Sequence, residues 1–163
     1  MTTRSVPAQI VGLLAWLALV LLAGGLGALA SVDAASFYAR LDKPAWAPPA
    51  GVFGPVWSAL YVLMAVAVWL VWREVDRPRA AALAVFVVQL AVNALWSWLF
   101  FAWHLGAWAF ADVLWLLLLI VVMIGLFRRV RPLAVWLMVP YLLWVAFASA
   151  LTWAVWRANS GML

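Results

Sequence analysis

Long apolar runs, separated by shorter polar connections, are the main pattern along the chain. A helix crosses ~30 Å of hydrocarbon with ~20 mostly apolar residues. Five runs reach that length: residues 10–32, 51–72, 80–103, 105–127 and 133–156. Each is too long and too evenly apolar for the alternating ~10-residue strands of a membrane barrel. The pattern predicts an all-α integral membrane protein, a single domain over residues 1–163 built as a bundle of five transmembrane helices.

Composition agrees with a protein whose main partner is the lipid bilayer. Hydrophobic residues make up 71% of the 163 and charged residues 9%, against about half and about a quarter in soluble domains. The formal charge is +5, but the basic residues lie between the apolar runs, so we expect no nucleic-acid partner. Cysteine is absent, which excludes disulfides and thiolate sites. We expect neither a metal site nor an obligatory cofactor.

The distribution of Lys and Arg predicts the orientation of the bundle. Of the ten basic residues, seven fall on the same side of the membrane as the N-terminus, if the five predicted helices cross it in turn, and three fall on the opposite side. The positive-inside rule then places the N-terminus in the cytoplasm of a bacterial cell and the first loop, residues 33–50, outside. Short connections further predict that the second and third helices are antiparallel neighbours, and likewise the fourth and fifth.

The first loop, residues 33–50, is unlike an ordinary connection. Prolines at positions 44, 48 and 49 restrict the backbone, so a stiff and extended segment is expected. The aromatic side chains of Phe37, Tyr38 and Trp46 lie among its charges. The loop is either a lid-like wall of a site or an interfacial anchor, and its composition leaves both interpretations open.

Polar side chains within the apolar runs are costly and therefore informative. Gln89 and Asn93 share one helical face, which Trp96 and Phe100 continue. This face should look inward, where an amide either bonds to another helix or, as we favour for Asn93, meets a ligand.

Two further aromatic stripes have the same helical spacing. They consist of Phe53, Trp57, Tyr61 and Met64 on the second helix, and of Tyr141, Trp144 and Ala148 on the fifth, which Pro140 should kink. Core packing would explain any one stripe alone. Fourteen tryptophans, however, exceed what two interfacial belts require, which favours an aromatic cavity.

Two isolated titratable residues, Asp112 and His104, are weaker indications of function. Asp112 is the one carboxylate within an apolar run, and near a helix start it would complement the helix dipole. A proton relay would need a second such group. His104 lies in a short connection and is expected at the surface rather than as a haem ligand. No serine or threonine has a histidine and an acid nearby in sequence, so hydrolase chemistry has no support.

Closely spaced motifs run through the whole chain in a specific order. They are Phe37-Tyr38, Leu41, Lys43-Pro44, Trp46, Pro48-Pro49, Phe53, Pro55-Val56-Trp57, Leu60-Tyr61, Gln89, Asn93, Trp96, Phe100-Phe101, Pro140-Tyr141-Leu142, Trp144, Phe147-Ala148 and Leu151. Together they resemble the signature of the translocator protein family, whose members are also called tryptophan-rich sensory proteins or peripheral-type benzodiazepine receptors.

This resemblance implies a five-helix bundle, commonly a homodimer, with a ligand cavity that opens toward the first loop. It also implies a receptor or sensor that binds porphyrins such as protoporphyrin IX, sterols in eukaryotic members, and synthetic isoquinoline or benzodiazepine ligands. The residues expected at the ligand, from the family motifs and the stripes together, are Tyr38, Trp46, Pro48, Phe53, Trp57, Asn93, Trp96, Tyr141, Trp144 and Ala148. Porphyrin carboxylates are expected near Arg40 and Lys43.

Two alternative functions remain open at the level of sequence. The first is enzyme-like degradation of porphyrins in light and oxygen, with Trp57 and Trp144 as the candidate catalytic residues. The second is transport of tetrapyrroles or sterols, although no broken inverted repeat is evident. A proposed sterol motif near the C-terminus needs a tyrosine that residues 151–157 lack, so sterol binding there is not expected.

Overall fold

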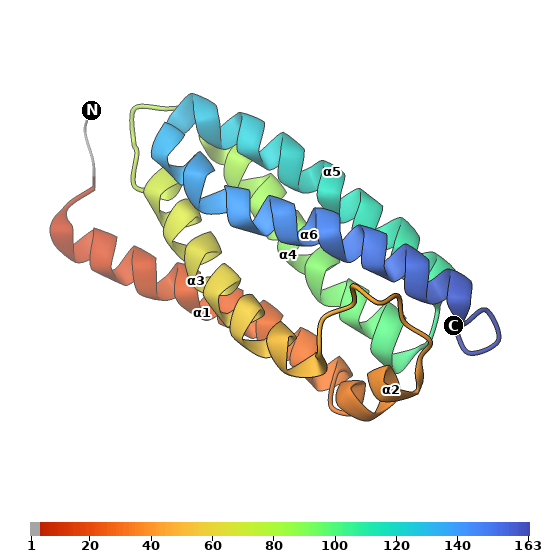
Figure 1. The fold of residues 1–163 in the computed structure, drawn as a ribbon. Helices are drawn as coiled ribbons and strands as arrows, with labels where there is room; N and C mark the ends of the chain where they lie inside the picture. Colours follow the sequence, from red (N-terminus) through yellow and green to blue (C-terminus); the bar gives the residue numbers. More distant parts are fainter. Residues whose placement is uncertain (1–3) are drawn as a thin grey trace.

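The computed structural model describes residues 4–163, and all of its long secondary-structure elements are helices (Figure 1). Five helical segments are long and apolar enough to cross a membrane. They are α1 (Val6–Ala30), η1 and α3 (Ala50–Val52 and Phe53–Trp72), α4 and η2 (Ala80–Ser97 and Trp98–Ala102), α5 (Gly106–Val130) and α6 (Pro132–Ala158). The predicted all-α membrane bundle of five helices is confirmed.

Local chemistry explains several helix ends. Pro7 lies in the first turn of α1 and Pro132 begins α6, positions where the missing amide proton of proline costs no hydrogen bond. Arg128 and Arg129 occupy the last turn of α5, where positive charge complements the helix dipole. Pro140 lies inside α6, which continues through it as one element.

The helices form a ring whose order differs from the order in the chain. Going round it, the neighbours are α1, α3, α6, α5 and α4, with α4 again beside α1 (Figure 1). The fourth and fifth transmembrane helices, α5 and α6, are neighbours as predicted. The prediction for the second and third is wrong, because α3 and α4 are not adjacent in the ring and meet mainly through long side chains that reach into its interior.

Glycines on α1 explain why α3 and α4 are kept apart. A Cβ atom added to Gly12 would clash with the Trp72 ring of α3, and one added to Gly24 would lie 2.7 Å from the Tyr61 ring of α3. At Gly27 it would lie 3.2 Å from Ser97 of α4. Small residues allow this close approach between membrane helices. Helix α1 therefore fits between α3 and α4, and the connection 73–79 spans the gap.

The two ends of the bundle differ in charge. Seven arginines gather at the end where α1, α4 and α6 begin and where α3 and α5 finish: Arg4, Arg73, Arg77, Arg79, Arg128, Arg129 and Arg131. Arg131 forms an ion pair of 3.4 Å with Glu74, and Arg77 donates to the carbonyl of Arg129 over 3.2 Å. The predicted grouping of these arginines at one end is thus present in the fold.

The first loop lies at the opposite end and is only partly extended. Helix α2 (Ala34–Arg40) occupies its first half, so the expectation of an extended segment throughout 33–50 is wrong. These seven residues contain no proline, and helix formation buries Phe37 and Tyr38 together with the following Leu41. The irregular remainder contains the three prolines.

Polar contacts within the loop fix its shape. Lys43 Nζ donates to the carbonyls of Tyr38 and Leu41 over 2.7 and 2.6 Å, which satisfies carbonyl groups at the end of α2. The Tyr38 hydroxyl donates to the carbonyl of Pro48 over 3.1 Å. Burial raises the pKa of Tyr38, so its hydroxyl remains a protonated donor at neutral pH. The loop is therefore an ordered cap on this end of the ring.

Candidate ligand cavity

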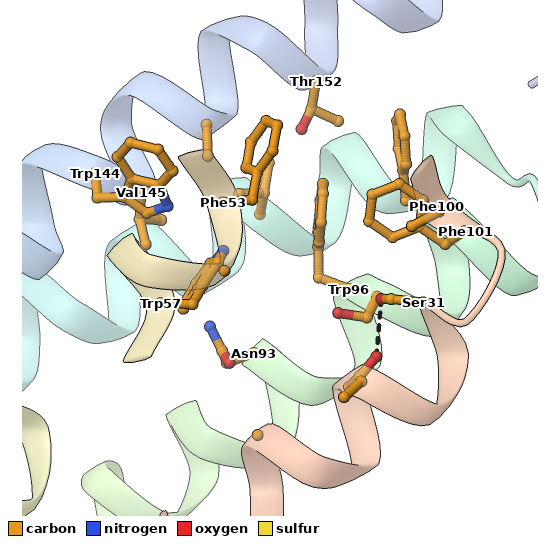
Figure 2. A pocket seen from close by; sticks show the side chains of 18 of the residues that line it. Ser31, Phe53, Trp57, Asn93, Trp96, Phe100, Phe101, Trp144, Val145 and Thr152 are labelled. Atoms are coloured by element: carbon orange, nitrogen blue, oxygen red, sulfur yellow. Dashed lines mark hydrogen bonds between the residues drawn. The ribbon is translucent and has the colours of Figure 1, made fainter. Parts of the chain in front are cut away.

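A cavity of about 580 Å³ lies inside the ring, below the first loop (Figure 2). Its volume falls within the ~300–1,000 Å³ of typical small-molecule sites. Side chains of all five transmembrane segments and of α2 line it. The cavity is therefore made by the whole bundle rather than by one pair of helices.

A chain of buried hydrogen bonds forms its polar floor. The Tyr61 hydroxyl donates to Asn93 Oδ1 over 3.1 Å, and Asn93 Nδ2 donates to the Tyr141 hydroxyl over 3.3 Å. Tyr141 in turn donates to Gln89 Oε1 over 2.8 Å. Gln89 and Tyr141 are fully buried, whereas Tyr61 and Asn93 line the cavity. Gln89 thus makes an interhelical bond, and Asn93 links this network to the cavity.

Aromatic rings form the walls. The centroids of Phe53 and Trp144 lie 6.0 Å apart in an edge-on arrangement, and Trp96 stacks on Phe100 at 5.2 Å and 11°. Trp57 lies 5.5 Å from Tyr61 and 6.3 Å from Tyr141. Such ring pairs hold one another in place, so several indole and phenyl rings surround the cavity in fixed positions.

One side of the cavity is lined by small residues that the sequence analysis missed. Gly24, Gly25 and Ala28 of α1 face Gly54 and Ser58 of α3 across this side. Gly25, Ala28, Gly54 and Ser58 are exposed, so the cavity reaches the outer surface of the bundle between α1 and α3. The run of small residues at 23–28 is the signal in the sequence that could have indicated this side of the cavity.

Helix α2 borders the loop end of the cavity. Ala34, Ala35 and Tyr38 of α2 contribute to its lining. A cavity opening toward the first loop was expected. Exposed lining residues lie at this end, at Ala35 and Ala50, as well as at the side between α1 and α3.

Seven of the ten residues expected at a ligand line the cavity: Tyr38, Phe53, Trp57, Asn93, Trp96, Trp144 and Ala148. Figure 2 shows Trp57 and Phe53 on α3, Trp144 on α6, and Asn93 and Trp96 on α4 around the same space. Their contact with a ligand stays a prediction.

The other three of the ten have different places. Trp46 is 51% exposed and packs 5.8 Å from Phe147, beside a shallow groove on the outer face of α5 and α6. Pro48 accepts the hydrogen bond from Tyr38. Tyr141 lies behind the floor with 0% exposure. None of these three residues lines the cavity.

The two cations expected near a porphyrin, Arg40 and Lys43, differ from each other in their surroundings. Lys43 Nζ is occupied by two backbone carbonyls and lies 4.9 Å from the Tyr38 ring, which makes it part of the loop's internal structure. Arg40 is exposed, with its guanidinium 5.9 Å from the Phe37 ring. Of the two, only Arg40 is free to meet an anionic group.

Asp112 and His104 lie outside the cavity lining. Asp112 is in the first two turns of α5, half-buried rather than at the helix start. His104 is exposed, as expected, and its ring lies 4.2 Å from that of Phe37. Within residues 4–163, no group of three or more His, Asp or Glu side chains is placed to hold a metal ion.

Comparison with known proteins assigns this architecture to a family. The TspO/MBR family model matches residues 15–157. The translocator protein of Homo sapiens is 38% identical over 128 residues, which cover 77% of this chain and 76% of that protein. Protein CrtK of Rhodobacter capsulatus is 38% identical over 141 residues, covering 85% and 87%. The tryptophan-rich protein TspO of Chlorobaculum tepidum is 35% identical over 156 residues, covering 93% and 98%. The chain belongs to the TspO/MBR family of membrane proteins.

Proposed function

We propose that this protein is a membrane receptor or sensor that binds an amphipathic planar ligand of the porphyrin class in the cavity below the first loop. The observation that carries the proposal is the combination of indole walls and a polar floor within one space of about 580 Å³. Flat aromatic ligands stack on indole rings with ~0.5–1.5 kcal/mol per pair beyond the burial of apolar area.

The polar groups of the lining favour a metal-free porphyrin such as protoporphyrin IX. The lining contains no imidazole, thiol or carboxylate side chain among the described residues, so it supplies none of the usual axial ligands of haem iron except the phenols of Tyr38 and Tyr61. The Tyr38 hydroxyl is already committed to Pro48 and that of Tyr61 to Asn93. Porphyrin carboxylates can extend toward the loop end, where Arg40 is exposed.

Titration with protoporphyrin IX in lipid nanodiscs tests this function. We expect saturable quenching of tryptophan fluorescence at one porphyrin per chain, because several indoles surround the cavity. Partition equal to that into empty nanodiscs would contradict the proposal.

A matched pair of glycine variants localises the binding. A Cβ atom at Gly54 or at Gly125 meets nothing within 4 Å, so both positions accept a phenylalanine without a clash at Cβ. Only Gly54 lines the cavity. Gly54→Phe should therefore weaken binding by about tenfold, the effect of ~1.4 kcal/mol, whereas Gly125→Phe should bind like the unmodified chain. Equal affinities would place the porphyrin elsewhere.

Light-dependent degradation of the bound porphyrin is the second candidate function. Trp57 lines the cavity and lies against the phenol rings of Tyr61 and Tyr141, so an oxidisable indole and two phenols adjoin the ligand space.

Transport of tetrapyrroles or sterols is a third candidate, favoured by the exposed lining between α1 and α3. A homodimer, as the family resemblance implies, is proposed as the assembly state.

The arginine-rich end is proposed to face the cytoplasm of a bacterial cell. The positive-inside rule supports this orientation, and the chain has no cysteine of its own to interfere with labelling. An impermeant thiol reagent outside intact cells should label Ala35→Cys, in the loop, and should spare Pro78→Cys, at the arginine-rich end. The opposite labelling pattern would reverse the orientation.

A further inference from the structure

Asn159, the residue that follows α6, holds the first loop in place through its side chain. Its Oδ1 accepts from the backbone amide of Asp42 over 2.9 Å, and its Nδ2 donates to the carbonyl of the same residue over 2.9 Å. Nδ2 also donates to the carbonyl of Val155 over 2.7 Å. The side chain is thus fixed to its own helix and pairs with both backbone groups of one loop residue.

The contact between Asn159 and Asp42 is important because it joins the first loop to a helix to which the loop is not covalently attached. The loop is covalently attached to α1 and α3, which adjoin each other in the ring, and it reaches across the end of the bundle to the C-terminal end of α6 (Figure 1). Over residues 4–163, the side-chain hydrogen bonds that join the loop to another helix are these two with Asn159; the others lie within the loop. Apolar rings such as Phe37 also pack against the bundle, but ring contacts are less directional than paired hydrogen bonds.

The environment of Asn159 makes the pairing strong. The residue is 7% exposed, so water competes poorly for its amide. Asp42 itself is exposed, but a separation that leaves Asn159 covered would leave its buried amide without two of its partners, and each unsatisfied buried group is costly. Lys43 and Tyr38 hold the loop together internally. Loss of the Asp42 pairing would leave the loop attached to the other helices only through apolar contacts such as those of Phe37 and Trp46.

We propose that Asn159 is a positioning residue of the ligand site: its pairing with Asp42 keeps the loop closed over the cavity and so sets how readily water-soluble molecules enter and how long a ligand stays bound. The part that concerns ligand residence rests on the proposed function. Loop closure itself does not, since it is measurable without a ligand.

Amide exchange and cysteine modification measure closure directly. The Asp42 amide should exchange about tenfold or more faster in Asn159→Ala than in the unmodified chain, since both hydrogen bonds to the Asn159 side chain are lost. A single cysteine at the cavity-lining position, Ala148→Cys, reports access from water. In nanodiscs, a charged methanethiosulfonate reagent should modify it faster by a similar factor when Asn159→Ala is added.

Two controls separate the contact from general loosening of the end of α6. Ser160→Ala alters the exposed next residue, which makes no side-chain hydrogen bond to the loop, and should leave both rates unchanged. Ala45→Cys, on an exposed part of the loop, gives the rate of the reagent with an accessible thiol.

Asn159→Asp offers a reversible version of the same test. A protonated carboxyl group can accept from the Asp42 amide and donate to its carbonyl as the asparagine does, whereas a carboxylate has no proton to donate. The modification rate of Ala148→Cys, divided by that of Ala45→Cys, should match the Asn159 chain at acidic pH and rise toward the Asn159→Ala value at neutral pH. The Asn159 chain at each pH is the control for the other charged or ionisable groups at this end of the bundle, Asp42, Arg157, Lys43 and His104. The acidic and neutral measurements use the same folded Asn159→Asp protein, so the rise between them decides the question even if Asn159→Ala fails to fold.

The outcomes are distinct. Equal modification rates in the Asn159 and Asn159→Ala chains overturn the proposal, and so does faster Asp42 exchange without faster modification at position 148. With closure established, dissociation of protoporphyrin IX should accelerate about tenfold in Asn159→Ala, and an unchanged rate overturns the residence role. If the unmodified chain binds no protoporphyrin IX, the proposed function fails while the exchange and modification rates still decide whether Asn159 closes the loop.

Discussion

Replacing Trp57 and Trp144 together with alanine should weaken protoporphyrin IX binding about 100-fold or more. Both line the cavity, one on α3 and one on α6. Each indole contributes ~0.5–1.5 kcal/mol from its ring contact with the ligand and ~1.5–3 kcal/mol from buried apolar area. Two such losses add up to about 4 kcal/mol or more, and relaxation of the cavity recovers part of it. The measurement is the nanodisc titration, accompanied by thermal unfolding.

The matched control for this variant is Trp136→Ala. Trp136 is on α6, like Trp144, but it is 73% exposed on the outer face of the bundle. It should bind porphyrin with unchanged affinity. A folded double variant with the affinity of the Trp136→Ala chain would show that the porphyrin does not stack on the two cavity indoles.

Replacing Trp57 with phenylalanine should separate stacking from chemistry. The phenyl ring retains most of the stacking face, so affinity should fall less than about tenfold. If a light-excited porphyrin takes an electron from the indole, the porphyrin is reduced and Trp57 oxidised, a step that phenylalanine supports far less readily. Under illumination in air, loss of the main porphyrin absorbance band should then slow to the rate of free porphyrin in the same detergent.

Trp144→Phe provides the internal comparison. Trp57 lies beside the electron-rich phenol rings of Tyr61 and Tyr141, which can stabilise an oxidised, positively charged indole, whereas the aromatic neighbours of Trp144 are Phe53 and Phe147. If the protein degrades porphyrin, the loss of light-dependent degradation should therefore be larger in Trp57→Phe than in Trp144→Phe. Equal rates for the unmodified chain, both variants and free porphyrin would eliminate an enzymatic role and leave binding.

The five membrane helices were predictable because a hydrocarbon environment imposes a length and an apolar composition on each of them. The inward orientation of the Asn93 face followed from the cost of an unpaired amide in lipid. The order of the helices in the ring was not predictable from connection lengths. It depends on the packing of Gly12 and Gly24 against side chains of α3, and a glycine in the sequence does not indicate which side chain will lie over it.

The residues of the candidate site were predictable to a lesser extent. Trp57, Trp144 and Asn93 combine an inward helical face with a family motif, and all three line the cavity. Trp46 and Pro48 lie in a loop with no helical period to orient them, so motif membership alone did not show that they lie outside the lining. The part of Asn159 in fixing the loop depends on a contact with Asp42 that spans 117 positions of the chain, which local sequence does not reveal.

The ring order also affects how the binding site can form during biosynthesis. Helix α3 lies between α1 and α6, so one of its neighbours enters the membrane before it and the other is the last of the five to be made. Until α6 arrives, the cavity lacks Trp144 and Ala148, the Tyr141 group of its floor and the Asn159 contact for the loop. A nascent chain with four inserted helices is therefore a membrane protein without a complete cavity, and the proposed ligand binding becomes possible only when the last helix completes the ring.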